Sequence, residues 1–207
     1  MPRKVQHENV IEAAKKLKIK HIFYTSFVHA DTTTSPLAVD HQATEKYIKA
    51  SGIPYSFVRD GWYLENESFT IQNAASGKPF VFGAGKAKAS WVLESELAKA
   101  IANILTFRSP KKVYELAGPP YTYLDLAKAT QKASGKNFEI KDLSPKDYQK
   151  YLTDQGYDKN LVNLLTGMVP VVSSGSQEVE SSDLEDALGH KLPPLSQRLK
   201  EVLKNNS

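Results

Sequence analysis

The chain has 207 residues, of which 41% are hydrophobic, so it can fold around a sizeable core and is not expected to be disordered. It contains no cysteine, which excludes disulfides and thiolate metal sites and suits a reducing compartment, so we expect a cytoplasmic protein. Its net charge of +4 comes from scattered lysines and no apolar run reaches membrane-spanning length, so neither nucleic acid nor a membrane is predicted as a partner.

Hydrophobic periodicity predicts helices and strands in alternation over the first 143 residues. In chain order we predict a helix at 7–19, a strand at 21–27, a helix at 41–51 that ends at Gly52, a strand at 54–58 and a helix at 66–76. There follow two short strands at 78–83 and 88–93, a helix at 94–107, a strand at 112–118, a helix at 121–135 capped by Thr122, and a strand at 138–143.

The pattern changes at Ser144, after which only helices are predicted, at residues 144–156, 160–169, 181–189 and 194–205. The segment 171–182, rich in serine, is predicted to be a mobile connection. We therefore expect an α/β protein with a doubly wound, mainly parallel sheet. Its α/β part spans residues 1–143, with some strands belonging to a second lobe, and a small helical lobe spans residues 144–207.

Two polar segments follow successive predicted strands. Ligands of open parallel sheets bind beyond the carboxyl ends of the strands. That rule selects the run Thr25, Ser26 and Phe27 with the loop through His29 and Asp31, and the segment from Asp60 to Asn66. Because the two strands should lie side by side, we predict one pocket between these segments.

Each candidate residue also has a purely structural interpretation. Trp62 and Tyr63 are aromatic and suit the packing of a helix on a sheet. Ser26 suits a loop cap, Asn66 suits the cap of the next helix, and Lys46 suits a solvated helix surface. The residues alone leave these alternatives open.

Several other chemistries lack their sequence signals. The five histidines show no metal-ligand spacing, so no metal site is predicted. No G-x-S-x-G nucleophile motif occurs. The stretch GAGKAK (83–88) lacks the spacing of a phosphate-binding loop and is predicted to be a hairpin turn. The close pairs His29–Asp31 and His41–Glu45 lack a third partner for acid–base work.

The motifs YTSF (24–27), ATEKYI (43–48) and RDGWYLEN (59–66) together resemble the NmrA-like branch of atypical short-chain dehydrogenases. The stretches KVYELAGPPYTYLDLAKATQKASGK and DLSPKDYQKYL are similar to the C-terminal half of the NAD(P)H:quinone oxidoreductase 2 group within that family. The resemblance covers nearly the whole chain. It implies the C-terminal part of a Rossmann-type domain with a small substrate lobe, and hydride transfer from NADPH or NADH to a quinone-like acceptor.

The resemblance also implies roles for individual residues. Lys46 and Ser26 would be catalytic, with Lys46 holding the nicotinamide ribose. The cofactor would be bound by Thr25, Ser26, Phe27, Lys46, Gly61, Trp62 and Tyr63. The acceptor would be bound by His29, Tyr63 and Asn66.

Two features depart from the wider superfamily. Gln42 stands where a Tyr-x-x-x-Lys pair would place its tyrosine, which disfavours simple carbonyl chemistry more than quinone reduction. No G-x-x-G-x-x-G turn for the cofactor pyrophosphate occurs among the 207 residues. We therefore expect this chain alone to bind NAD(P)H weakly or not at all.

Strand 21–27 is then predicted to lie at a sheet edge, which favours pairing with another copy or with an upstream fragment. The main functional hypothesis is a quinone reductase of the NmrA-like kind. The alternatives are a non-catalytic protein of the same family that senses NAD(P) or serves as an interaction module, and an inactive remnant.

Overall fold

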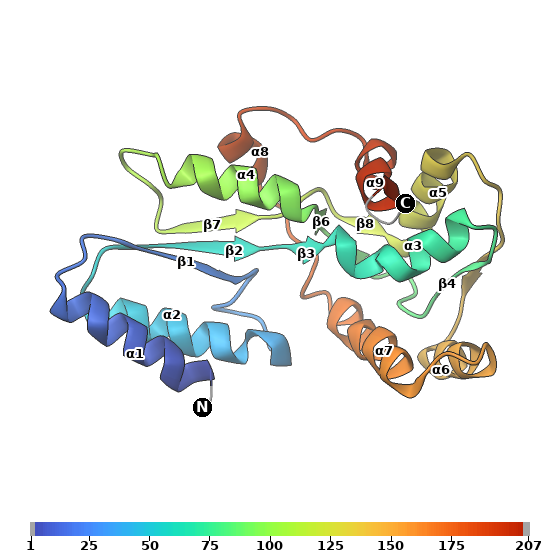
Figure 1. Ribbon diagram of the computed structural model, residues 1–207, viewed down its shortest axis with the longest axis horizontal. Helices are drawn as coiled ribbons and strands as arrows, with labels where there is room; N and C mark the ends of the chain where they lie inside the picture. Colours follow the sequence, from blue (N-terminus) through green and yellow to red (C-terminus); the bar gives the residue numbers. More distant parts are fainter. Residues whose placement is uncertain (1–2, 205–207) are drawn as a thin grey trace.

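The structure is a computed structural model that describes residues 3–204. Its first part is a three-stranded parallel sheet in the order β1-β2-β7, formed by β1 (Ile22–Phe27), β2 (Tyr55–Asp60) and β7 (Val113–Leu116). The helices α1 (Arg3–Lys16) and α2 (Val39–Ser51) cover one face of the sheet, and α4 (Glu94–Ile104) and α8 (Asp183–Leu188) lie over the other (Figure 1). This α/β/α layering confirms the predicted fold class.

Successive side chains of β2 point to opposite faces of the sheet and pack into two separate hydrophobic cores. Phe57 of β2 packs with Ile11 and Ile48 on the side of α1 and α2. Its neighbour Val58 packs with Leu97 of α4 on the other side. The helix α2 ends at Gly52, whose φ of 77° is the left-handed conformation that glycine adopts without steric cost.

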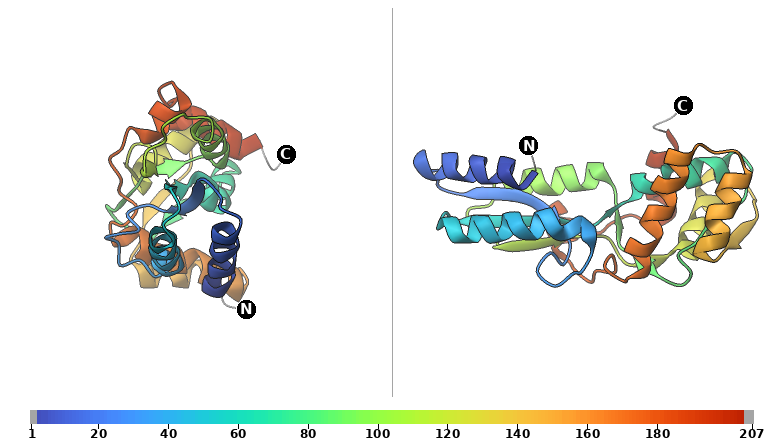
Figure 2. Two further views of the ribbon diagram at one scale, coloured as in Figure 1. Left: turned by 90° about the vertical axis from the view of Figure 1, so that its left-hand side faces the viewer. Right: turned by 90° about the horizontal axis from the view of Figure 1, so that it is seen from below.

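The second part continues from the ends of these strands. β2 runs on into β3 (Trp62–Tyr63), which pairs in parallel with β6 (Trp91–Val92). The largest core lies here, among α3 (Ser68–Ala75), α5 (Tyr123–Ser134) and α9 (Leu195–Lys204). The remaining helices of this part, α6 (Pro145–Asp154) and α7 (Lys159–Ser173), pack on each other beside it. Figure 2 shows the two parts lying end to end.

The predicted hairpin at GAGKAK is wrong. β4 (Phe80–Phe82) pairs in parallel with β9 (Ile140–Asp142), and β5 (Lys88–Ala89) pairs antiparallel with β8 (Tyr121–Thr122). The strands on either side of the turn therefore find distant partners rather than each other. Local turn chemistry could not reveal this, because a glycine-rich turn fits a simple chain reversal equally well.

The segment predicted to be a mobile connection is instead packed against the body of the protein. α7 extends through Ser173, and Gln177 and Val179 further along are buried. Ser90 holds this segment with three hydrogen bonds: its N–H donates to Gln177 O (2.8 Å), its hydroxyl donates to Val179 O (3.0 Å) and accepts from Val179 N–H (2.9 Å). This segment brings the chain back from α7 to the sheet.

The four helices after Ser144 lie in different places. α6 and α7 pack together, α9 packs on α5, and α8 returns to cover α4 and β7. Among the described residues, no helix combines the length and the apolar character needed to cross a bilayer.

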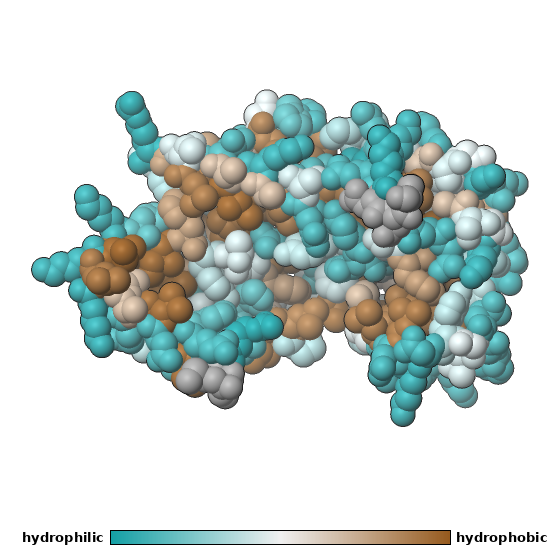
Figure 3. Space-filling view, in the orientation of Figure 1, coloured by the Kyte–Doolittle hydropathy of each residue, from teal (hydrophilic) through white to brown (hydrophobic). Residues whose placement is uncertain are grey.

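β1 is an end strand of the described three-stranded sheet, as predicted. Beside it, α1 and β1 enclose an apolar hollow of about 250 Å³ whose lining includes Val10, Ile22 and Phe23. Apolar side chains of α1 and the turn after it are also exposed, among them Val10, Leu17 and Ile19. Figure 3 shows hydrophobic surface gathered at this end of the molecule.

Candidate functional site

A cavity of about 300 Å³ opens at the carboxyl ends of β1 and β2. In the register of the sheet, Phe27 stands beside Asp60, so the two strands end level with each other. The cavity is lined by Arg3, Thr25, Ser26, Phe27, Leu37, His41, Asp60, Gly61, Trp62, Tyr63 and Asn66. Residues 25–27 and the segment that starts at Asp60 therefore line one cavity, as predicted, but His29 and Asp31, which were predicted to belong to the first side, do not line it.

Gly61 allows β2 to turn into β3 at the floor of this site. A Cβ atom at this position would lie 3.0 Å from the Cβ of Ala117 and 3.0 Å from the carbonyl oxygen of Ser90. Both are tighter than ordinary contacts, and one is with backbone. The glycine is thus required by close packing against the segment after β7, and this packing places Asp60 and Tyr63 on the cavity side.

Trp62 lines the cavity but belongs mainly to the large core. Its side chain is buried, and its indole N–H donates to Glu67 Oε1 at 3.1 Å. The same carboxyl oxygen accepts a hydrogen bond from Tyr123 Oη at 2.7 Å. Burial raises the pKa of Glu67, against the opposing effect of these hydrogen bonds. The core-packing interpretation of Trp62 therefore describes most of its contacts.

Asn66, Tyr63 and Asp60 form the polar wall of the cavity. Asn66 lies in the short 3-10 helix Leu64–Glu67, so it does not cap α3, which is preceded by Glu67. The hydroxyl of Tyr63 donates to Asp60 Oδ2 at 3.1 Å. Burial raises the pKa of Asp60 to about 6, although the hydrogen bond from Tyr63 opposes the shift. Burial and the adjacent Asp60 also raise the pKa of Tyr63 well above its usual range.

A network of buried charges lies next to the cavity and centres on Arg59. The guanidinium donates to Glu45 through Nε (2.9 Å to Oε1) and Nη2 (2.8 Å to Oε2), which is a bidentate pair. Its Nη1 donates to Glu115 Oε1 at 2.7 Å and to Asp31 Oδ1 at 2.9 Å. Burial alone would lower the pKa of Arg59, but the hydrogen bonds to Glu45 and Glu115 outweigh it and raise the pKa.

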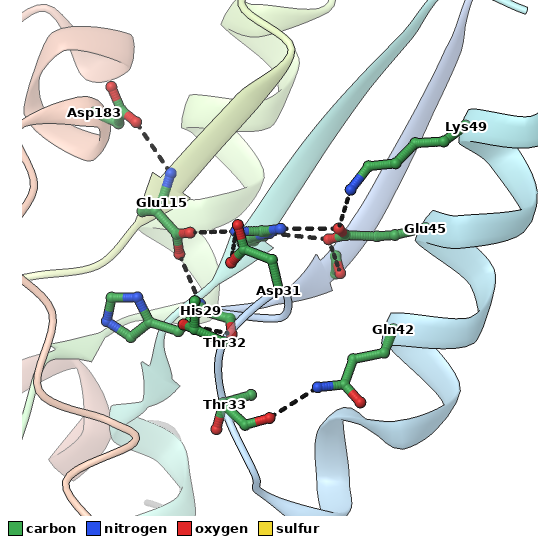
Figure 4. Close-up of polar contacts among 11 residues, drawn as sticks. His29, Asp31, Thr32, Thr33, Gln42, Glu45, Lys49, Glu115 and Asp183 are labelled. Carbon is green, nitrogen blue, oxygen red and sulfur yellow. Dashed lines mark hydrogen bonds and ion pairs between the residues drawn. The ribbon is translucent and has the colours of Figure 1, made fainter.

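This Arg59 network joins four elements around the site. Figure 4 shows Glu45 on α2, Glu115 on β7 and Asp31 in the loop after β1 converging on one point. Glu115 also accepts a hydrogen bond from the backbone N–H of His29 at 3.1 Å, and its own N–H donates to Asp183 at 3.0 Å. The network thereby fixes the loop that follows β1.

Comparison with known proteins assigns the family. A family model described as "NmrA-like family" matches residues 4–197. The chain belongs to the NmrA-like family. This confirms the resemblance drawn from the sequence motifs.

One relative and two solved structures are similar to this NmrA-like protein over nearly its whole length. It is 34% identical, over 99% of its own length and 72% of the relative's, to quinone oxidoreductase 2 of Escherichia coli strain K12. The crystal structure of an NADPH-dependent quinone oxidoreductase from E. coli complexed with NADPH matches with a TM-score of 0.81 and 33% identity, over 96% of this chain and 71% of that one. The triphenylmethane reductase of Citrobacter sp. matches with a TM-score of 0.84 and 32% identity, over 97% and 71% of the two chains.

Three residues with roles predicted from the family have surroundings that do not by themselves show those roles. Ser26 lines the cavity, but its hydroxyl donates to the buried Glu45 at 2.7 Å. Lys46 is exposed on α2 and is not among the residues that line the cavity. His29 lines a separate polar hollow with Thr32 and Glu178, and its ring Nε2 lies 3.3 Å from Glu178 O. Their catalytic and acceptor-binding roles stay predictions.

Sequence reasoning missed the Arg59 network and the Asp60–Tyr63 pair. Gln42, at the position of the absent tyrosine, donates through its amide to Thr33 O at 2.8 Å and so supports the same loop (Figure 4). A signal for Arg59 was present, because an arginine inside an apolar strand is costly to bury without carboxylate partners. Which carboxylates supply the pairing depends on packing between segments up to 56 residues apart.

The residues of the cavity fit the nicotinamide end of a dinucleotide cofactor. Aromatic Phe27 and Tyr63 and polar Thr25 and Asn66 face a space of about 300 Å³, the lower end of the range for small-molecule sites. This space suits one ring system with its sugar rather than a whole dinucleotide. The sequence has no G-x-x-G-x-x-G turn for the pyrophosphate, so the fit concerns the nicotinamide end alone.

Proposed function

We propose that this NmrA-like chain takes part in NAD(P)H-dependent reduction of a quinone-like acceptor, with the nicotinamide ring and the acceptor meeting in the cavity at the ends of β1 and β2. The carrying observation is that residues 25–27 and 60–66 enclose this one cavity. A bound cofactor supplies the hydride, and the chain supplies the walls that orient the two rings. The assignment is supported by the similarity to quinone oxidoreductase 2 and by the NADPH bound in the structure of an NADPH-dependent quinone oxidoreductase from the same organism.

In this proposal Phe27 and Gly61 border the ring of the cofactor, while Tyr63 and Asn66 border the acceptor. Thr25 offers an exposed hydroxyl on the β1 side of the cavity. Lys46 holds the ribose hydroxyls as predicted, which requires its side chain to reach the cofactor from α2. Among residues 3–204 Lys46 has no ion-pair partner, so its ammonium group is available for that role.

The first experiment measures NADPH oxidation by the purified chain with a simple benzoquinone, together with NADPH binding by fluorescence. We expect quinone-dependent oxidation that saturates only at high NADPH concentration, because a glycine-rich phosphate turn is absent from the sequence. No oxidation with quinones at any NADPH concentration would overturn the proposal. Saturable binding of NADPH without turnover would instead favour the alternative of an NAD(P)-sensing protein.

Two lysines of α2 provide a matched pair of variants. Lys46→Ala should weaken NADPH binding by about tenfold, since one charge-assisted hydrogen bond contributes on the order of 1.5 kcal/mol. Lys49→Ala, one turn further along the same helix, should bind NADPH like the unmodified chain, because Lys49 is exposed and pairs with Glu45 at 3.7 Å. Equal affinities for both variants would remove the ribose role of Lys46.

Pairing through the edge of β1, with a second copy as the partner, also remains part of the proposal. It is supported by the position of β1 at the end of the described sheet and by the apolar hollow beside it. Sedimentation velocity would detect such a pair, and a monomer at high protein concentration would exclude it.

A further inference from the structure

The most unusual group of the cavity is the carboxyl of Asp60, the last residue of β2. One of its oxygens, Oδ2, accepts the hydrogen bond from Tyr63. The other, Oδ1, is buried and has no hydrogen-bond partner within residues 3–204. A buried carboxylate oxygen without a donor is costly, so this side chain is poorly adapted to being ionised where it lies.

The charged and titratable groups around Asp60 do not relieve this cost. Apart from Tyr63 on its own segment, Arg3 of α1 and His41 of α2 line the same cavity. The guanidinium of Arg3 pairs with Asp40 at 3.8 Å, and burial followed by the nearby Arg3 lowers the pKa of His41. Glu65 and Glu94 lie close enough to Tyr63 to add negative charge around its hydroxyl. Within the described residues, neither Arg3 nor His41 forms an ion pair with Asp60.

We propose that Asp60 and Tyr63 form a proton relay that supplies the proton which quinone reduction requires in addition to the hydride. This inference rests on the proposed function, because it assigns a second role within the same cavity. When Asp60 is ionised, the Tyr63 hydroxyl points its hydrogen at Oδ2. When Asp60 is protonated, its own O–H donates to Tyr63 Oη, and the phenolic hydrogen is free to point into the cavity.

The step balances in atoms and electrons. The acceptor gains a hydride, with its two electrons, from bound NAD(P)H, and one of its oxygens gains the phenolic proton of Tyr63. Tyr63 Oη takes the carboxylic proton of Asp60 in the same movement, so no tyrosinate is formed. Asp60 is left as a carboxylate and takes a proton from water before the next cycle. The sum is quinone, NAD(P)H and one proton giving hydroquinone and NAD(P)⁺.

The relay predicts a defined dependence on pH. Burial raises the pKa of Asp60 to about 6, so the donor form of the pair is abundant below that pH and scarce above it. Turnover of a quinone should therefore fall as pH rises through about 6. The group that loses its proton is a carboxyl shielded from solvent, and its titration can be observed without any cofactor.

Asp60→Asn tests the relay with a side chain of the same shape that cannot supply a proton. At about pH 5.5 we expect this variant to reduce a benzoquinone with a kcat at least about tenfold lower than that of the unmodified chain. This loss is smaller than the full rate enhancement that general acid catalysis typically provides. We also expect its rate to show no fall as the pH rises to about 8. Tyr63→Phe breaks the relay at its other member and should also lower kcat by about tenfold. Circular dichroism is used to check that both variants are folded.

A cationic triphenylmethane dye is the matched control acceptor, because its central carbon takes a hydride and no proton. We expect Asp60→Asn to change the rate of dye reduction by less than about threefold, so that the loss is specific to the proton-requiring acceptor. A loss of equal size with both acceptors would show a structural role for Asp60 and overturn the relay. If the unmodified chain does not reduce the dye, the pH profiles of quinone reduction by the unmodified chain and by Asp60→Asn are compared instead. A fall in rate through about pH 6 that occurs only in the unmodified chain supports the relay, and identical profiles overturn it.

A measurement independent of turnover completes the test. In the chain labelled with ¹³C at aspartate carboxyls, one resonance should titrate at about pH 6 and be missing from Asp60→Asn. Absence of such a resonance, or equal quinone kinetics of the unmodified chain and both variants from about pH 5 to 8, would overturn the relay while leaving the proposed function intact. Failure of the unmodified chain to reduce any quinone would overturn the proposed function itself.

Discussion

Arg59 and Asp60 are neighbours on β2, yet their surroundings are opposite. The Arg59 side chain is buried among three carboxylates and uses three of its nitrogens as donors to them. Asp60 faces the cavity, accepts one hydrogen bond from Tyr63, and leaves its second oxygen without a donor. Successive side chains of a strand point to opposite faces. The end of β2 therefore contributes Arg59 to the buried network and Asp60 to the cavity.

The comparison separates stability from function. A fully satisfied buried network fixes one arrangement of the elements that meet in it, here β2, α2, β7 and the loop through Asp31. A buried carboxyl with an unmet hydrogen-bonding requirement instead lowers the stability of the fold, and such local conflicts concentrate at functional sites. We therefore expect changes at Arg59 to act on folding, and changes at Asp60 to act on chemistry and on its pH dependence.

The largest expected effect follows from removing Arg59. Arg59→Met keeps a long apolar side chain but leaves Glu45 buried without its bidentate partner. Loss of one partner of a buried ion pair typically costs about 3–5 kcal/mol, so we expect a fall of that order in the free energy of unfolding. Urea denaturation at neutral pH measures it.

Lys49→Ala is the control for Arg59→Met, because it removes the solvent-exposed partner of the same Glu45. We expect it to change the free energy of unfolding by less than about 0.5 kcal/mol. If Arg59→Met lowered the free energy of unfolding no more than Lys49→Ala does, the Arg59 network would not stabilise the fold.

The second effect concerns the stability cost of ionising Asp60. Its pKa is about 6 in the folded chain against a usual 3.8, so the folded state binds the proton more tightly. The associated stability is fully present below about pH 4 and is lost as pH rises through 6. Two pKa units correspond to about 2–3 kcal/mol. Between pH 4 and 7, the free energy of unfolding of Asp60→Asn should therefore rise by about 2 kcal/mol relative to that of the unmodified chain.

Urea denaturation of both chains at several pH values measures this gain, and Asp125→Asn provides the contrast. Hydrogen bonds from Thr122 lower the pKa of Asp125, so its folded-state stabilisation is present at neutral pH and lost on acidification. The two variants should shift stability in opposite directions as pH rises. A flat difference between Asp60→Asn and the unmodified chain would show that Asp60 is not strained in its ionised form.

The sequence was sufficient to predict the cavity but not the network behind it. The placement of residues 25–27 opposite 60–66 follows from a general rule about parallel strand ends, which needs only the order of the elements. The partners of Arg59 come from α2, β7 and a loop, and the packing that brings them together is not encoded in any local pattern. For the same reason the hairpin at 83–88 was predicted wrongly, since β4 and β5 pair with strands much later in the chain.

Ser26 lies between the two sides of the comparison and gives the smallest expected effect. It lines the cavity, and its catalytic role is predicted from the family, yet its hydroxyl donates to Glu45 inside the Arg59 network. Ser26→Ala removes one hydrogen bond to a charged group, so we expect a loss of about 1–2 kcal/mol in the free energy of unfolding. Thr25→Ala, the exposed neighbour on β1, should cost less than about 0.5 kcal/mol.

The rate of quinone reduction by Ser26→Ala, measured under conditions where the variant is fully folded, separates its two possible roles. If Ser26 only supports Glu45, the substitution should lower turnover only through the lower stability of the variant. Lowering the temperature should then restore the rate. A loss of kcat that persists in the fully folded variant would place Ser26 in the chemistry, on the same side as Asp60. Ser26 would then belong to the reactive cavity and Glu45 to the stabilising network, and the hydrogen bond between them would connect the two. The division between stability and function would not lie only between Arg59 and Asp60.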